Sequence, residues 1–380
     1  MTYTSTLLKN LPLPLRVIGG VVLFGIAVWG VGYGWNAIVG IGPDYFFHYR
    51  QAPLDYFQGN TRLYDDGTTS LPLLPWAVFI LAPSLPLPVN YGQAMVIVIT
   101  LLGLLWLTVS VAGENHKRIP PHAIVLPLLN LFTVDLLVRG NYEGFLALGL
   151  AMAWVGYKTE RPLLSGIGVA IFITKPINMI LPGLFFAAIS LRRGVRYSVF
   201  TALPTLVLLL MSFPLFGWDW MVRYVTYTTT VESTYTTLSF DNTALYLQTA
   251  LWRTFEFWGL PQEIALFICG IGLLATAIYI VTRPKGTARA LIITLCAALV
   301  FGIYVHGNHY VLLAPALAAL IARDWRYSAI WLLTFSPLLR LSLNRFDVAW
   351  TDSLYAITLL VVWVSIAVRE HLGGHRTATG

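Results

Sequence analysis

The chain has 380 residues, of which 57% are hydrophobic and only 11% are charged. A soluble domain of this length carries roughly twice that share of charged residues, so the composition excludes an ordinary soluble protein and indicates a polytopic membrane protein. The formal net charge is +7, but the basic residues are scattered through short loops, which argues against a nucleic-acid partner. Cys269 and Cys296 both lie inside apolar runs and imply no disulfide framework.

The apolar segments predict an all-α polytopic membrane protein with about twelve spans, forming a single transmembrane domain over residues 1–380. The first segment, residues 16–40, is too long for the core of a signal peptide, so we expect a retained first helix. The other expected spans are residues 91–112, 121–138, 142–157, 162–174, 177–191, 197–216, 262–281, 288–304, 309–322, 327–340 and 353–369. Several are shorter than the ~20 residues that cross a bilayer, so broken or re-entrant helices are expected among them.

Charge is concentrated just after the first apolar segment, in a first outer loop over residues 41–90. Seven ionisable side chains fall within 25 residues there, namely Asp44, His48, Arg50, Asp55, Arg62, Asp65 and Asp66. Aromatic residues interleave them, a mix typical of a segment at a membrane surface. The apolar residues 71–88 carry five prolines and are expected to be interfacial or partly re-entrant, because each proline removes a backbone donor.

Asp44 is the best-placed acid of this loop, because it comes directly after Pro43 and just beyond the first span. Two interpretations remain open at this stage. Asp44 suits the N-cap of a surface helix that starts at Tyr45, and it equally suits a general base held at the membrane boundary. Asp65 and Asp66 precede Gly67 and are expected to belong to a turn.

Three polar residues interrupt the later apolar runs. Lys175 stands before Pro176, and a lysine at membrane depth needs a partner or an anion unless its ammonium reaches the interface. A lipid phosphate would be a natural ligand. His306 and His309 are three residues apart, and they suit phosphate contact, proton transfer or a metal ion. No HExxH pattern or nearby carboxylate favours the metal, so no metal site or cofactor is predicted.

Two further outer segments could contact substrate. Residues 139–141 form a polar turn, and Glu143, which follows it, carries a charge that favours the start of a helix. The second long outer loop, residues 217–261, is rich in threonine and aromatic residues. It suits either sugar binding or a covering loop with rings at the membrane interface.

The distribution of basic residues predicts which loops face the cytoplasm. If the N-terminus is cytoplasmic, sixteen of the 24 Lys and Arg residues fall in cytoplasmic loops. The other eight are Arg50, Arg62, Arg139, Lys175, Arg223, Arg253, Arg340 and Arg345. This bias agrees with the positive-inside rule. We therefore expect a multi-pass protein of the cell membrane, with both termini in the cytoplasm and the active site facing outward.

Several short motifs, taken in order, resemble the GT-C fold of membrane glycosyltransferases and, more narrowly, glycosyltransferase family 87. They are Asp44-Tyr45 with Tyr49, Gly59, Leu63-Tyr64, the proline-rich Leu71 to Pro88, Arg139-Gly140-Asn141, Lys175-Pro176 and Asp241-Asn242-Thr243-Ala244-Leu245. The resemblance covers about residues 20 to 320. The sequence departs from the family pattern at Tyr142-Glu143, and at Leu74-Pro75 where a pair of prolines is usual.

The resemblance implies a mannosyltransferase that uses a polyprenyl-phosphate sugar as donor and an outer-face lipid or glycan as acceptor, within the membrane lipids. It implies Asp44 as the general base of a single displacement with inversion. Lys175, His306 and His309 are then expected at the donor phosphate or in a proton relay, with Arg50 and Arg62 as weaker candidates. Asn141, Glu143 and Asn242 are expected to contact the acceptor or the sugar.

Two other classes of protein fit the same composition. A transporter or flippase of lipid-linked sugars would share the spans, but it is expected to show paired half-repeats and charges at mid-membrane, which are not evident here. A non-catalytic assembly protein of the cell envelope would not require a base such as Asp44. The position of the charges at the outer edge therefore favours the glycosyltransferase.

Overall fold

The computed structural model describes residues 12–64, 71–114, 119–237, 250–283, 285–328, 356–361 and 363–364. Across these ranges the regular structure is helical and no strand is formed, which confirms the predicted all-α class. The first half of the chain contains α2 (Leu13–Ile38), the π-helix η1 (Tyr45–Arg50), α3 (Gln51–Phe57), α4 (Ala77–Leu81), the 3₁₀-helix η2 (Ala82–Ser84), α5 (Val89–Ala112), α6 (Pro121–Leu128), α7 (Leu131–Arg139), α8 (Glu143–Lys158), α9 (Pro162–Phe172) and α10 (Pro176–Arg192). The second half contains α11 (Val195–Phe216), α12 (Trp220–Thr237), α13 (Leu251–Phe257), α14 (Gln262–Thr282), α15 (Ala288–Val300), the 3₁₀-helix η4 (Gly307–Leu313), α16 (Ala314–Arg323) and the 3₁₀ turn η5 (Trp325–Tyr327).

Four of the described helices, α2, α5, α11 and α14, are long and apolar enough to cross a membrane. The pair α6 and α7, bent by 55°, makes a fifth if it is one broken span. The expected number of about twelve spans is not confirmed. Helices do form at the other expected segments, but α9 has 11 residues and α15 has 13, fewer than the ~20 that a full crossing needs. Most of the expected segment 327–340 and about half of the segment 353–369 lie outside the described residues.

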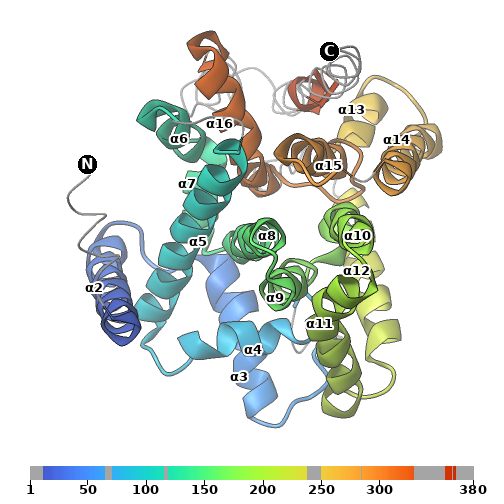
Figure 1. Cartoon of the computed structure of the whole chain (residues 1–380). Coiled ribbons are helices and arrows are strands. Elements are labelled where there is room, and N and C mark those ends of the chain that lie inside the picture. The colour runs from blue at the N-terminus through green and yellow to red at the C-terminus, as the bar shows by residue number, and fades with distance from the viewer. Residues whose placement is uncertain are drawn as a thin grey trace.

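The long apolar helices differ in how much protein surrounds them. Only 11% of the apolar window of α2 is buried, and the values for α11 and α14 are 17% and 22%, whereas 61% of the window of α5 is buried. Helices that are apolar all round and yet exposed require lipid around them. The shorter α8 lies among the other helices, packed against α5 on one side and α9 on the other (Figure 1). The polar residues at the start of α8 are therefore held in the protein interior.

The interfaces of α8 are made by close contact of backbones. A Cβ atom at Gly144 would lie 2.4 Å from the Cα atom of Thr100 on α5. A Cβ atom at Gly149 would lie 2.7 Å from the carbonyl oxygen of Gly168 on α9. Small residues of this kind let membrane helices approach closely enough for van der Waals packing to hold them together.

The two loops that are predicted to face outward contain helices. The first includes the π-helix η1 and the pieces α3, α4 and η2, so the prolines break residues 71–88 as predicted. The second contains α12 and α13 on either side of residues 238–249, which the structure does not describe.

A substitution at Gly168 tests the packing of α9 on α8. We expect Gly168→Ala to lower the unfolding temperature in detergent, because its Cβ atom would lie 2.3 Å from the backbone nitrogen of Ala153. Overpacking of this kind costs about 1–3 kcal/mol. Gly270→Ala in α14 is the matched control, since a Cβ atom there meets nothing within 4 Å. An equal loss of thermal stability in both variants would contradict the proposed packing.

Candidate functional site

The loop after α2 and the turn between α7 and α8 are in direct contact, although about a hundred residues separate them. The backbone N–H of Gly42 donates to Oε1 of Gln93 on α5, at 2.8 Å. A Cβ atom at Gly42 would lie 2.3 Å from the carbonyl oxygen of Val138. Gly140 has a φ of +69°, a left-handed conformation that glycine adopts without strain, and its position faces the Cβ atom of Tyr45. These two glycines allow the contact that brings Asp44 to Asn141.

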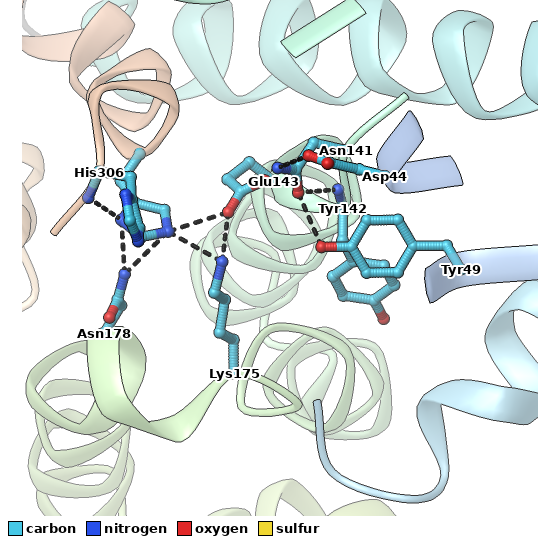
Figure 2. A network of polar contacts seen from close by, with 9 residues as sticks. Asp44, Tyr49, Asn141, Tyr142, Glu143, Lys175, Asn178 and His306 are labelled. Carbon is cyan, nitrogen blue, oxygen red and sulfur yellow. Dashed lines mark hydrogen bonds and ion pairs between the residues drawn. The ribbon is translucent and has the colours of Figure 1, made fainter. Parts of the chain in front are cut away.

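Asp44 accepts a hydrogen bond from this turn. Nδ2 of Asn141 donates to Oδ2 of Asp44 at 2.9 Å, and Nη1 of Arg139 lies 3.9 Å from the other carboxylate oxygen. Oδ1 of Asn141 accepts from the hydroxyl of Tyr49 at 2.9 Å and from the backbone N–H of Tyr142 at 2.6 Å. Figure 2 shows Asn141 between Asp44 and Tyr49. The aspartate is thus held by the end of α7 and by the turn before α8, and Tyr49 of η1 supports that turn.

The environment of Asp44 suits a carboxylate that accepts and releases a proton. Burial raises the pKa of Asp44 above its ordinary value, although the nearby guanidinium of Arg139 lowers it in part. The side chain is 19% exposed, so a substrate can reach it. Asp44 makes no capping hydrogen bond to the helix that follows, so the N-cap interpretation was wrong. The general-base interpretation remains.

A second polar group lies deeper in the protein, where α8, α10 and η4 meet. Oε1 of Glu143 lies 2.5 Å from Nζ of Lys175 and 3.0 Å from Nε2 of His309 (Figure 2). Nζ of Lys175 is itself 2.8 Å from Nε2 of His309. Both Glu143 and His309 are fully buried and Lys175 is 6% exposed, so the lysine does not reach to the interface as one interpretation allowed. It has the buried partner that a lysine at this depth requires.

The hydrogen bonds define the tautomer of His309. Its Nδ1 accepts from the backbone N–H of His306 at 3.0 Å and lies 2.9 Å from Nδ2 of Asn178. A backbone N–H can only donate, so Nδ1 carries no proton and the proton of the neutral ring is on Nε2. That proton points to Glu143, which therefore accepts from both Lys175 and His309.

Two buried oxygen atoms of this group have acceptor capacity left. Oε2 of Glu143 and Oδ1 of Asn178 have no hydrogen-bond partner among the described residues. Buried polar atoms are nearly always paired, so these two oxygens suit donors such as hydroxyl groups of a ligand. The two polar groups are linked through the chain. Asn141 contacts Asp44, and Glu143, two residues later, contacts Lys175 (Figure 2).

The remaining predicted residues are placed differently. The guanidinium of Arg50 donates to the backbone carbonyls of Ser84, Leu85 and Leu87, which makes it an anchor for the segment before α5. Arg62 lies on an exposed stretch after α3, and Asn242 lies outside the described residues. In the part of the chain that the structure describes, no group of three or more His, Cys, Asp or Glu side chains is arranged to hold a metal ion.

Sequence analysis missed three contributors to the site. Arg139 was predicted only as part of a polar turn and a family motif, Tyr49 was only a family feature, and Asn178 was not predicted. The position of Asn178, three residues after Lys175, was a usable signal, because residues three apart lie on one face of a helix. No local pattern connects Tyr49 with Asn141, because 92 positions separate them.

The site combines a buried polar group, surrounded by apolar helices, with an accessible carboxylate just beyond the first span. These features define an integral-membrane protein with a candidate catalytic centre. The sequence model of glycosyltransferase family 87 matches residues 75–315, well over half of the chain. The chain therefore belongs to glycosyltransferase family 87 and is a membrane glycosyltransferase. No curated protein and no solved structure matches it. The matched region includes Asn141, Glu143, Lys175 and His309 and begins after Asp44.

The buried ion pair can be tested by removing its negative partner. We expect Glu143→Gln to lower the free energy of unfolding by about 3–5 kcal/mol, because it leaves the ammonium of Lys175 without a buried counter-ion. The double variant E143Q/K175M removes both charges and should recover part of the loss. Thermal unfolding in detergent measures both.

Glu160→Gln is the matched control for this experiment. Glu160 lies 3.6 Å from Arg193 but is 80% exposed, so its loss should cost at most about 1 kcal/mol. Equal unfolding temperatures for Glu143→Gln and Glu160→Gln would show that the buried pair does not stabilise the fold.

Proposed function

We propose that this protein transfers mannose from a polyprenyl-phosphate donor to a lipid or glycan acceptor on the outer face of the membrane, with inversion at the anomeric carbon. Family membership supports the sugar transfer. One observation carries the rest of the proposal. A partly accessible carboxylate, Asp44, lies just after the first membrane helix and beside a buried ammonium–carboxylate–imidazole group. A lipid-linked phosphate rests at the membrane interface, where the first membrane helix is predicted to end.

Asp44 is the proposed general base. In a single displacement, the acceptor oxygen attacks the anomeric carbon while the bond from that carbon to the phosphate oxygen breaks. The acceptor proton passes to Asp44, and polyprenyl phosphate leaves. Sugar hydroxyls have high pKa values, so a positioned base contributes ~10²–10⁴ in rate. The raised pKa of Asp44 supports this role, since a base whose pKa is nearer the working pH accepts a proton more readily.

The buried group is proposed to bind the donor. Lys175 and His309, with His306 beside them, would stabilise the charge that develops on the leaving phosphate. The ammonium has three donors, and Glu143 uses one of them. The unpaired oxygens of Glu143 and Asn178 would accept hydrogen bonds from sugar hydroxyls. Asn242 is still predicted to contact the sugar, and the described contacts of Arg50 and Arg62 give no support for a role at the phosphate.

The transfer reaction can be tested directly with purified protein. Polyprenyl-phosphate-[¹⁴C]mannose is incubated with the protein in lipid nanodiscs and a lipid extract of cell membranes, and labelled products are identified by mass spectrometry. We expect a mannosylated lipid or glycan and free polyprenyl phosphate. Translocation of intact donor across vesicles, without transfer of the label, would instead identify a flippase.

Asp44→Asn separates a catalytic role from a structural one. The amide keeps the shape of the side chain, so we expect the unfolding temperature to change little while transfer falls by ~10²–10⁴. Asp55→Asn in α3 is the control, because it removes a carboxylate from the same loop and should leave transfer intact. Near-parental transfer by the Asp44 variant would rule out Asp44 as the base.

The outward orientation of the site is tested by cysteine labelling. In a background without Cys269 and Cys296, a cysteine at the exposed Gln58 should react with an impermeant maleimide in intact cells. A cysteine at the exposed Lys285 should react only after lysis, because residues 283–289 are predicted to be cytoplasmic. The reverse pattern would place the active site on the cytoplasmic face.

A further inference from the structure

We propose that Asn141 is a positioning residue, which holds the Asp44 carboxylate ionised and oriented toward the acceptor, and that it is not a sugar contact. This inference deepens the proposed function and rests on the role of Asp44 as the base. It replaces the expectation from sequence that Asn141 contacts the acceptor or the sugar.

The orientation of the Asn141 amide follows from its neighbours. The atom that faces the backbone N–H of Tyr142, at 2.6 Å, must be the oxygen, because a backbone N–H can only donate. The nitrogen therefore faces Asp44 and donates to Oδ2 at 2.9 Å. The hydroxyl of Tyr49 donates to the same amide oxygen and fixes it from the other side. This arrangement cannot be reversed without losing the bond to Tyr142.

The same contacts leave the amide oxygen of Asn141 with no lone pair free to accept a hydrogen bond from a sugar hydroxyl. It already accepts two hydrogen bonds, which is the number of its lone pairs. The residue is 7% exposed, whereas the side chain of Asp44 is 19% exposed. The carboxylate is therefore the group that an acceptor meets, and Asn141 supports it from behind.

Charged groups from several elements face Asp44. Arg139 on α7 and His48 on η1 favour the charged carboxylate, whereas Glu143 on α8 and Asp135 on α7 disfavour it, and burial disfavours it most. Arg139 is 3.9 Å away and also bonds Asp135 at 3.0 Å. A direct hydrogen bond from Asn141 to the charged form offsets part of the cost of burial. Its removal should therefore be visible in the pH dependence of transfer.

The test measures kcat/KM for polyprenyl-phosphate-mannose from pH 4.5 to 8 in nanodiscs, with the unfolding temperature of each variant. The acid limb is the fall of kcat/KM at low pH, where Asp44 becomes protonated. In Asn141→Ala we expect this limb to move to higher pH by about one unit, because a hydrogen bond to the charged carboxylate is lost. We also expect kcat at pH 7 to fall at least tenfold with little change in KM for the donor. Misplaced catalytic groups have effects of this size.

Asn130→Ala is the matched control. Asn130 is as buried as Asn141 but caps α7, where its oxygen accepts from the N–H of Thr133 at 2.8 Å. Its loss should lower the unfolding temperature and leave the acid limb in place. Tyr49→Phe is the second test variant, because it removes one hydroxyl and keeps the ring. We expect its acid limb to shift upward by about half a unit.

The outcomes separate the two proposals. If Asp44→Asn abolishes transfer but the acid limb stays in place in folded Asn141→Ala, the positioning role is wrong and the base is unaffected. If Asn141→Ala does not fold, an unmoved limb in Tyr49→Phe has the same meaning. If Asp44→Asn retains transfer, the proposed base fails, and the positioning role fails with it.

Discussion

The buried ion pair between Glu143 and Lys175 is the constraint on which the site depends. It joins the first residue of α8 to the residue before α10. Breaking such a pair costs several kcal/mol, so the start of α8 has little freedom to move. Asn141 lies two residues earlier in the chain, and its position fixes that of Asp44. The geometry of the accessible carboxylate therefore depends on a charge pair in the interior of the protein.

The two acids of the site have different environments. Glu143 is fully buried and is neutralised by Lys175, whereas Asp44 is partly exposed and is stabilised by one amide donor, by a guanidinium 3.9 Å away and by His48. A carboxylate that is matched by a buried ammonium stays ionised and serves as a fixed charge. In the proposed mechanism the carboxylate with weaker compensation exchanges protons, so the two environments support different roles for two similar side chains.

Much of the helical class and part of the site were predictable from sequence. The composition required membrane helices, Lys175-Pro176 marked a break between two of them, and a lysine at that depth required a partner. The identity of that partner was not predictable, because Glu143 also fitted the start of a helix. The expected number of spans is not confirmed among the described residues, because hydropathy does not distinguish a short buried helix such as α9 from one that crosses the bilayer. The link from Tyr49 through Asn141 to Asp44 arises from tertiary contacts alone.

The sparse contact between α2 and the rest of the protein has a consequence for the choice of membrane. Helix α2 has 26 residues, which at 1.5 Å per residue is about 39 Å, longer than the ~30 Å hydrocarbon core of a bilayer. Little of α2 is buried inside the protein, so tilting in the surrounding lipid is one way for it to match the thickness of the bilayer. The hydrogen bond from Gly42 to Gln93 fixes the chain to α5 two residues before Asp44. Residues 39–41 separate α2 from this anchor, so a change in the tilt of α2 need not move Asp44.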